Sequence, residues 1–271
     1  MEKHSITLKL EPNEDYYRSA TVIVQSPDGT LKLEYQVEQD GELGMQIDPT
    51  QIPDNEIWYR TSTGRKLSTN ADICNANLVS NTYSCGVGVL RFENTILTIN
   101  SQAFTDNTLI ELYVPDCVER LSSAFLRYSR LKSFRVPKEL KYAQGDDEIG
   151  PFEDNPELTI LTGHHVSEDG KCLVIGTELA DFVGIDLTEY TTPHDVTIIR
   201  EYAFCENNTL EKIIISEGVQ IIEDHVFLCN TVSNRLKEVS LPKSLKQIGS
   251  HVFFGCNKIE LFSGEYDFVS N

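Results

Sequence analysis

The amino-acid sequence predicts a mainly β protein, in which a repeated unit stacks into a solenoid with short parallel strands behind a small antiparallel segment. A recurring aliphatic–Phe pattern predicts the stacked unit. A short β-branched run within each unit predicts the parallel strands. Strict alternation of polar and apolar residues near the N-terminus predicts antiparallel strands with one buried face.

The repeated unit is defined by an aliphatic residue four or five positions before a Phe. Successive Phe positions, including a degraded copy at Phe152, are 21, 27, 52, 23 and 26 residues apart, so the longest gap equals two units and must hold an insertion. A unit of this size cannot bury its own apolar face, so the turns must stack and the Phe column is predicted to form a core spine. The clear copies are TILTINSQAF (95–104), CVERLSSAF (117–125), VTIIREYAF (196–204), VQIIEDHVF (219–227) and LKQIGSHVF (245–253).

Each unit also contains a short β-branched run that is typical of a very short strand. The run commonly ends in Pro, which cannot donate a ladder hydrogen bond and therefore stops the strand. Three residues after each Phe lies a position where a buried Asn or Cys can hydrogen-bond the backbone of the next turn. The runs are Leu112–Pro115, Phe134–Pro137, Ile213–Ser216 and Val239–Pro242, and the position holds Asn107, Tyr128, Asn155, Asn207, Asn230 and Cys256.

This pattern closely resembles the BspA-like leucine-rich repeat, whose consensus is Leu-x-x-Ile-x-Ile-Pro-x-x-Val-x-x-Ile-x-x-x-Ala-Phe-x-x-Cys. The segment KEVSLPKSLKQIGSHVFFGCNKI (237–259) matches it nearly position for position, and the resemblance covers about residues 92–262. The resemblance implies a leucine-rich-repeat solenoid. It also implies adhesion to host or microbial surface proteins.

The insertion within the long gap is predicted to be a β-hairpin near residues 164–187. Apolar runs flank Asp169-Gly170 in this segment, and Asp-Gly between apolar runs is a strong two-residue turn signal. The repeat resumes with YTTPHDVTIIREYAF (190–204).

The N-terminal part divides into two predicted regions. Residues 1–43 contain SITLKL, SATVIVQ and LKLEYQVEQDG around a Ser-Pro-Asp-Gly turn, and they resemble the last strands of a BACON domain, an immunoglobulin-like module, without its early strands. Residues 44–91 are predicted to connect and cap the solenoid, with a small hairpin formed by a strand at Trp58-Tyr59, a turn at Ser62-Thr63-Gly64 and Lys66-Leu67. The solenoid then covers residues 92–262, and residues 263–271 form a C-terminal tail.

Composition narrows the classes of partner. The 23 Lys and Arg residues against 42 Asp and Glu residues give a net charge of −19, which repels nucleic acid and anionic lipid. Seven cysteines without a CxxC pair argue against a disulfide framework or a zinc site. No apolar stretch is long enough to span a bilayer, and the N-terminus has no apolar core of a signal peptide, so the protein is either cytosolic or begins after an export signal.

Three groups of side chains are candidate catalytic or metal sites, but a simpler structural role explains each group better. A cluster at the insertion is the most enzyme-like, although it lacks an orienting pattern for a nucleophile and suits exposed turn residues. Two histidines at the same repeat position could share a metal, although a surface ladder explains them more simply. An acidic run offers oxygen ligands for calcium without the ordered spacing of a calcium loop. The groups are His164, His165, Glu168, Asp169 and Cys172; His225 and His251; and Asp146, Asp147, Glu148, Glu153, Asp154 and Glu157.

We therefore predict no catalytic residue, no cofactor, no metal site and no enzymatic activity. The preferred function is a bacterial cell-surface or secreted binding module that recognises an extracellular protein or glycan through the solenoid surface, with membrane attachment only through an export or lipid signal outside this chain. The alternatives are an accessory module or structural spacer of a larger glycan-processing surface protein, and a cryptic hydrolase built on His164, His165, Glu168 and Asp169.

Overall fold

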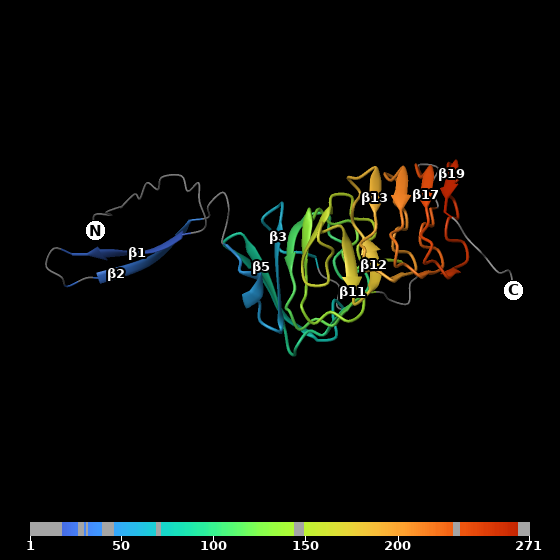
Figure 1. Cartoon of the computed structure of the whole chain (residues 1–271). Helices are drawn as coiled ribbons and strands as arrows, with labels where there is room; N and C mark the ends of the chain where they lie inside the picture. Colours follow the sequence, from blue (N-terminus) through green and yellow to red (C-terminus); the bar gives the residue numbers. More distant parts are fainter. Residues whose placement is uncertain are drawn as a thin grey trace.

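The computed structural model describes residues 18–26, 30, 32–39, 46–68, 72–143, 149–229 and 234–264, and it confirms a mainly β protein. These residues form nineteen strands and one short 3-10 helix, η1 (Pro49–Gln51), and no α-helix is found among them. Figure 1 shows that the turns of the solenoid follow one another along a single direction, from the strands near β3 to β19. Parallel pairing between consecutive turns is the main long-range organisation of the described chain.

The N-terminal strands β1 (Arg18–Gln25) and β2 (Lys32–Gln39) form a two-stranded antiparallel hairpin that lies apart from the solenoid (Figure 1). Alternation places Val22 and Val24 on the same face as their partners Tyr35 and Leu33, as the sequence predicted. No second sheet covers this face among the described residues. The predicted strand SITLKL and residues 40–43 lie outside the described residues, so the sandwich-like and BACON-like interpretation of residues 1–43 stays a prediction.

A four-stranded antiparallel sheet stands at the start of the solenoid, in the order β4-β5-β3-β7. The predicted hairpin between Trp58-Tyr59 and Lys66-Leu67 is wrong, because β3 pairs with β5 and β7, whereas residues 66–68 form no strand. The true hairpin joins β4 to β5 through Cys85-Gly86, where both residues have positive φ angles of 53° and 74°. The strands are β3 (Glu56–Thr61), β4 (Leu78–Ser84), β5 (Val87–Phe92) and β7 (Leu109–Tyr113).

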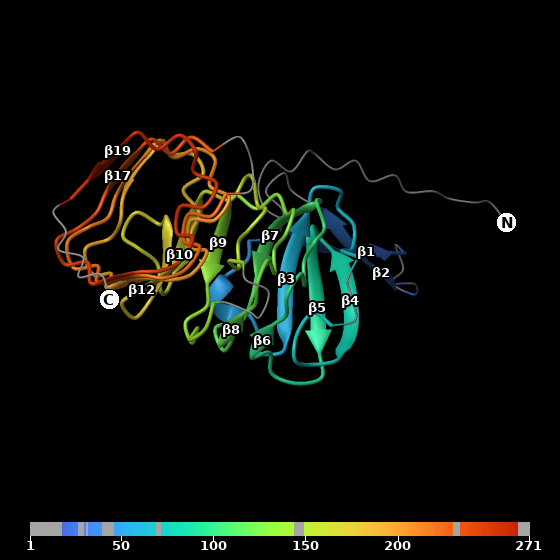
Figure 2. The ribbon, with the colours of Figure 1, turned by 90° about the vertical axis from the view of Figure 1, so that its right-hand side faces the viewer.

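Most solenoid turns contribute two short strands, which form two columns, whereas the turn that carries β10 contributes one strand and a single parallel bridge between Arg120 and Tyr142. In Figure 2 the last turns superimpose on one another, as expected when each unit pairs with its neighbours. Both columns are interrupted between the turn that carries β10 and the turn that carries β13. One column holds β6 (Thr98–Ile99), β8 (Arg120–Leu121), β14 (Ile198–Ile199), β16 (Ile221–Ile222) and β18 (Gln247–Ile248); the other continues from β7 with β9 (Ser133–Val136), β10 (Ile160–Gly163), β13 (Glu189–Thr191), β15 (Lys212–Ile214), β17 (Glu238–Ser240) and β19 (Leu261–Ser263).

The insertion fills the interruption with a hairpin made of β11 (Cys172–Ile175) and β12 (Glu178–Phe182). The predicted turn at Asp169-Gly170 is confirmed, because the Gly170 amide donates to the Ser167 carbonyl and Val166 forms an antiparallel bridge with Leu173 of β11 across it. A second turn, at residues 176–177, joins β11 to β12. β12 then pairs in parallel with β14, so the hairpin supplies the first strand of the C-terminal ladder.

The hairpin also separates two hydrophobic cores. Leu173 packs in the N-terminal core, whereas its neighbours Cys172 and Val174 pack in the C-terminal core. A strand that is apolar on both faces is typical of a buried strand between two layers. The solenoid therefore consists of two half-solenoids with β11–β12 as the shared wall.

The Phe spine is confirmed as two separate stacks rather than one column. In the C-terminal half the ring centroids of Phe204 and Phe227 lie 4.9 Å apart, and those of Phe227 and Phe253 lie 5.2 Å apart. Phe182 of the hairpin begins this stack, with its centroid 4.7 Å from that of Phe204. Phe152 contacts Phe125 and Phe134 of the N-terminal core instead.

The predicted ladder three residues after each Phe is only partly present. Asn155 accepts hydrogen bonds from the Ser129 amide and hydroxyl on the previous turn, and the Cys256 thiol donates to the Phe227 carbonyl. By contrast, Asn107 is exposed and Tyr128 is 52% exposed, so neither side chain is buried between turns. Asn230 lies outside the described residues.

Candidate functional site

The predicted histidine–carboxylate cluster at the insertion does not converge on a common point. His164, Glu168 and Asp169 are exposed, whereas Cys172 is fully buried with its thiol 3.1 Å from the Tyr190 hydroxyl. Desolvation raises the pKa of the Cys172 thiol, which disfavours a reactive thiolate. His165 contacts the Lys138 carbonyl through Nε2 at 2.9 Å. The cryptic-hydrolase alternative therefore loses the only residues that suggested it.

The two histidines at one repeat position form a ring ladder, as the sequence predicted. The centroids of His225 and His251 are 5.4 Å apart with the planes 12° from parallel, and Tyr202 stacks on His225 at 5.3 Å. All three residues have positive φ angles of 55–62°, which places the same left-handed turn in each unit. Glu201 lies 3.2 Å from His225 Nδ1. Within the described part of the chain, no group of three or more His, Cys, Asp or Glu side chains could hold a metal ion.

The acidic run is divided by the structure. Asp146, Asp147 and Glu148 lie outside the described residues. Among the rest, Asp154 pairs with Arg127 at 2.7 Å and Glu157 pairs with Arg130 at 3.0 Å. Glu153 has a different environment, because it lines a cleft.

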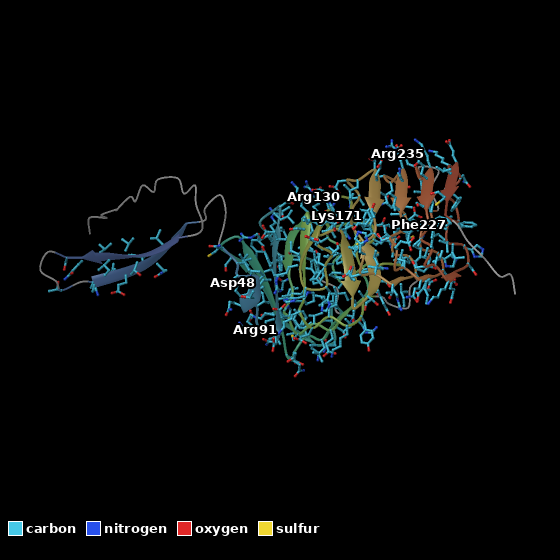
Figure 3. All side chains as sticks on the ribbon, in the orientation of Figure 1. Asp48, Arg91, Arg130, Lys171, Phe227 and Arg235 are labelled. Atoms are coloured by element: carbon cyan, nitrogen blue, oxygen red, sulfur yellow. The ribbon has the colours of Figure 1, made fainter. Side chains whose placement is uncertain are left out.

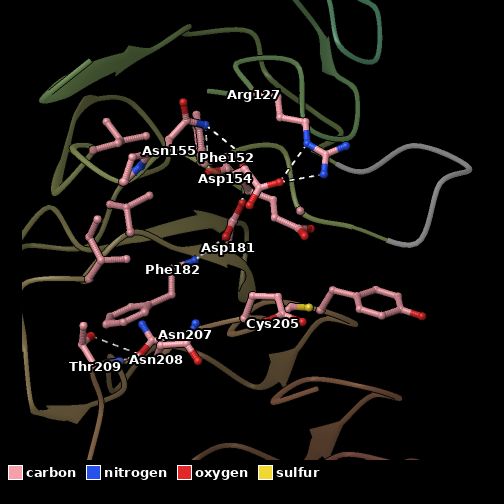
Figure 4. A pocket seen from close by; sticks show the side chains of 18 of the residues that line it. Arg127, Phe152, Asp154, Asn155, Asp181, Phe182, Cys205, Asn207, Asn208 and Thr209 are labelled. Carbon is pink, nitrogen blue, oxygen red and sulfur yellow. Dashed lines mark hydrogen bonds and ion pairs between the residues drawn. The ribbon is translucent and has the colours of Figure 1, made fainter. Parts of the chain in front are cut away.

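This cleft lies where the two half-solenoids meet, and we call it the junction cleft. Its volume is about 750 Å³, and the segments that line it come from both halves and from the hairpin wall. Figure 4 shows Arg127 and Asp154 on one side, Cys205, Asn207, Asn208 and Thr209 on the other, and Asp181 between them. The cleft arises because the inserted hairpin replaces a regular turn, which leaves the two columns of strands unpaired at this point. It is lined by residues 127–128, 150, 152–156, 158, 181–183, 185, 202 and 205–209.

Asp181 is a buried carboxylate in the wall of the cleft. The register of the hairpin pairs Leu173 with Asp181 and Val174 with Leu179, so it skips Ala180 and forms a bulge. Such a bulge redirects the side chain that follows it. Both Asp181 oxygens accept backbone hydrogen bonds, from Phe152 at 3.0 Å and Phe182 at 2.7 Å. Burial nevertheless raises the pKa of Asp181 to about 7, because desolvation outweighs these two bonds.

Glu153 is the second acid of the cleft, and one of its oxygens lacks a partner. Burial, reinforced by the negative charge of Asp154, raises the pKa of Glu153 to about 7. Its Oε2 atom is buried without a hydrogen-bond partner. The Nδ2 atom of Asn207 is likewise buried and unpartnered, while Oδ1 accepts from the amides of Thr209 and Leu210. The residues that line the cleft thus include a buried acceptor and a buried donor that make no hydrogen bond within the described protein.

The remaining walls of the cleft are apolar or fixed by hydrogen bonds. Aromatic and aliphatic side chains alternate with the polar groups around the cleft. Asn155 is held by four hydrogen bonds, two of which it donates, to the carbonyls of Phe152 and Glu153. Burial raises the pKa of the Cys205 thiol, so this thiol is neutral near pH 7. The apolar lining residues are Tyr128, Phe152, Pro156, Leu158, Phe182, Val183, Ile185 and Tyr202.

The sequence points to six of the cleft residues for other reasons: Phe152 as part of the spine, Glu153 and Asp154 as part of the acidic run, and Tyr128, Asn155 and Asn207 as ladder residues. Asp181 was missed, although a lone acid within the apolar run LADFVGI (179–185) is a usable signal, because a buried carboxylate needs a compensating partner. Burial and the surrounding carboxylates keep the Cys205 thiol protonated by raising its pKa, so the polar groups of the cleft suit binding of a polar or charged group.

Comparison with known proteins agrees with the repeat architecture. The model of the BspA type leucine rich repeat region matches six copies, over residues 81–146 and 177–266, which is more than half of the chain. No curated protein matches the chain.

Two solved structures are similar to this chain. The pneumococcal vaccine antigen PcpA is 21% identical, with a TM-score of 0.41, and the match covers 60% of this chain and 47% of that one. A leucine-rich repeat protein from Bacteroides ovatus is 17% identical, with a TM-score of 0.38, and covers 60% of this chain and 45% of that one. This chain therefore spans about half the length of each.

No helix within the described residues is long and apolar enough to cross a membrane. The family match coincides with the two ladders seen in the structure, and its gap at residues 147–176 coincides with the start of the insertion. The chain belongs to the family of BspA-type leucine-rich-repeat proteins.

Proposed function

We propose that this protein is a cell-surface or secreted, non-enzymatic module that binds an extracellular macromolecule of host or microbial origin. The observation that carries the proposal is the junction cleft, which holds unpartnered polar atoms of Glu153 and Asn207 in a rigid repeat scaffold. Such a pre-formed concave site with a few polar groups is typical of binding. Proteins built from BspA-type repeats are typically found at surfaces or secreted, which supports the location.

The solenoid surface supplies a second supporting feature. The ladder of Tyr202, His225 and His251 ends at Phe254, which is 55% exposed and contacts His251 edge to face at 5.8 Å. Aromatic side chains that are fixed by stacking provide contact area with little loss of conformational entropy. An extended row of this kind suits contact with a protein or glycan chain.

The experiment is a binding screen with the purified protein immobilised. Host matrix proteins, microbial surface proteins and glycan arrays are passed over it at micromolar concentration, with a heat-denatured sample as the control. We expect saturable binding of at least one macromolecule. Uniform absence of binding across the three panels contradicts the proposal.

A second candidate is a structural spacer or accessory module of a larger surface protein. The observation that favours it is the β1–β2 hairpin, on which Leu33 and Tyr35 are 53% and 54% exposed. An isolated two-stranded hairpin is at best marginally stable in water, so an apolar face of this kind suits packing against further strands. The β3, β4 and β5 strands are proposed to cap the solenoid, supported by the pairing of β3 along β7.

A further inference from the structure

The junction cleft is lined by more negatively than positively charged side chains. Four carboxylates and one guanidinium line it. The guanidinium belongs to Arg127, and it is engaged by Asp154 through contacts of 2.8 Å and 2.7 Å. Neither Glu153 nor Asp181 forms an ion pair with any described residue. A buried carboxylate is stabilised most strongly by an opposite charge. The four acids are Glu153, Asp154, Asp181 and Glu206.

The apolar lining of the cleft limits which positively charged ligands fit it. Phe152, Phe182 and Tyr202 line the cleft and contribute apolar surface, while their rings pack on other aromatic rings of the two halves. Leu158 and Val183 add aliphatic surface beside them. This combination suits a ligand with an aliphatic stem and a charged end, because the stem buries apolar area while the head reaches the carboxylate.

We propose that the junction cleft binds the cationic end of a lysine or arginine side chain presented by the partner molecule, with Glu153 as its principal charged acceptor. The proposal rests on the proposed function and names the chemical group that the partner contributes. The Glu153 carboxylate accepts a hydrogen bond from the cationic group, and Asn207 Nδ2 donates to a carbonyl of the same ligand. Glu153 Oε2 and Asn207 Nδ2 are both buried and unpartnered in the unliganded protein.

Both oxygens of the Glu153 carboxylate can accept. Among the described residues, neither oxygen forms a hydrogen bond or ion pair, and a carboxylate can bind either a compact ammonium or the planar fork of a guanidinium. The arginine counterpart in the test below therefore separates the two head groups.

Binding is expected to strengthen as pH rises through about 7. The pKa of Glu153 is raised to about 7 by burial. In the free protein its carboxyl group is therefore largely protonated at pH 6 and largely ionised at pH 8. Lysine and arginine side chains stay charged across this range. Since only the carboxylate attracts the cationic group, affinity follows the ionisation of Glu153 and, more weakly, of Asp181. The titratable or charged groups that face Glu153 across the cleft are Arg127, Tyr128, Asp154, Asp181, Tyr202, Cys205 and Glu206.

The test is a titration of the full chain with Nα-acetyl-lysine N-methylamide, followed by NMR chemical shifts of the cleft residues. Three comparators separate the contributions: the Nε-acetylated derivative lacks the charge, the arginine counterpart replaces the ammonium, and 1,5-diaminopentane lacks the peptide carbonyl. We expect the lysine derivative to bind at least tenfold more tightly than the acetylated one and severalfold more tightly than 1,5-diaminopentane, and the arginine counterpart to bind at least tenfold more tightly than the acetylated derivative as well. Equal binding of the acetylated derivative overturns the proposal.

Variants locate the binding in the cleft. Glu153→Gln keeps the shape and removes the charge, and we expect at least a tenfold loss of affinity for the lysine derivative. Glu157→Gln is the matched control, because Glu157 lies in the same segment but pairs with Arg130 and does not line the cleft. A Glu153→Gln protein that binds like the wild type, with an unchanged thermal melt, overturns the proposal.

Two further readouts separate this proposal from the proposed function. Affinity of the wild type should rise at least threefold between pH 6 and pH 8, and this rise should be absent in Glu153→Gln. A pH-independent affinity in the wild type contradicts the role of Glu153. If a macromolecule binds in the screen while neither the lysine derivative nor its arginine counterpart binds the cleft, this proposal fails and the proposed function stands.

Discussion

Asp181 illustrates how a single buried carboxylate can make stability depend on pH. Burial raises its pKa from the ordinary value of 3.8 to about 7 in the folded protein. A raised folded-state pKa contributes stability that is fully present below pH 4 and is lost as pH rises through 7. We therefore expect the free energy of unfolding to fall between pH 5 and pH 8, with a slope approaching about 1.4 kcal/mol per pH unit for one proton.

The measurement is a series of urea melts at pH 5, 6, 7 and 8. Asp181→Asn should flatten the profile, because the substituted side chain does not titrate. Glu153 adds a change of the same sign, since its pKa is raised to about 7 as well, so some slope should remain in this variant. An Asp181→Asn protein with the full wild-type slope would refute the assignment.

Phe227 tests the stacked core of the C-terminal half. It lies within the C-terminal turns, at the opposite end of the body from Asp48 and Arg91 (Figure 3), and its ring packs between those of Phe204 and Phe253. Truncation to Ala removes a buried ring and leaves a cavity, so we expect Phe227→Ala to lower the free energy of unfolding by about 3–5 kcal/mol.

The control for this substitution is Phe254→Ala, because Phe254 is 55% exposed whereas Phe227 is buried. The expected loss there is about 0.5 kcal/mol. Comparable losses in the two variants, measured by denaturant melts at one pH, would show that the stack is not a principal stabilising feature.

At the level of elements, the two turns of the insertion differ in the space around their glycines. Gly170 has a φ of +72°, and an added Cβ would lie 2.8 Å from the Leu161 carbonyl oxygen. Gly176 has a φ of +65°, and an added Cβ would meet no atom within 4 Å. Gly176→Ala should therefore cost only the left-handed backbone penalty of about 1–2 kcal/mol.

Gly170→Ala should cost about 1–3 kcal/mol more than Gly176→Ala, because the clash adds to the same backbone penalty. The Gly170 carbonyl also accepts from the Leu161 amide, so a shift of this turn weakens its attachment to β10. Paired thermal and urea melts measure the difference. Equal stability of the two variants would mean that the turn at Gly170 relaxes without cost.

These elements also show what a single sequence can predict. The repeat and the Phe stacks were predictable, because periodicity reports a burial pattern that every turn shares. The hairpin at Cys85-Gly86 was missed, since its first residue is not the Asn or Asp that usually marks a turn with two positive φ angles. The turn at Asp169-Gly170 was predictable from its Asp-Gly pair, whereas the second turn at residues 176–177, which joins β11 to β12, was missed because Gly-Thr is a weaker turn signal.

The junction cleft was beyond prediction for a different reason. Its polar groups come from three segments that are brought together only where the ladders are interrupted. The bulge at Ala180, which directs Asp181, depends on strand register and leaves no mark in the alternation of residues. Glu153 looked like an ordinary solvated acid, because burial at the junction is a property of the assembled halves.

At the scale of the whole molecule, two cores joined by one hairpin predict unequal and separable unfolding. The N-terminal core contains Leu109 and Leu173, and the C-terminal core contains Leu179 and Phe227. In a solenoid each turn is stabilised mainly by its neighbours, so an interruption of both ladders lowers the coupling between the halves. We expect hydrogen exchange followed by mass spectrometry to show two groups of protected amides, with different opening free energies.

Substitutions in each half test this separation. Phe227→Ala should accelerate exchange in β14–β19 and leave β3–β9 almost unchanged, whereas Leu109→Ala should do the reverse, because the two side chains belong to different cores. Leu179→Ala in the shared wall should affect mainly the C-terminal group, since β12 pairs with β14. Uniform acceleration across the whole chain in all three variants would instead show that the hairpin couples the two halves into one cooperative unit.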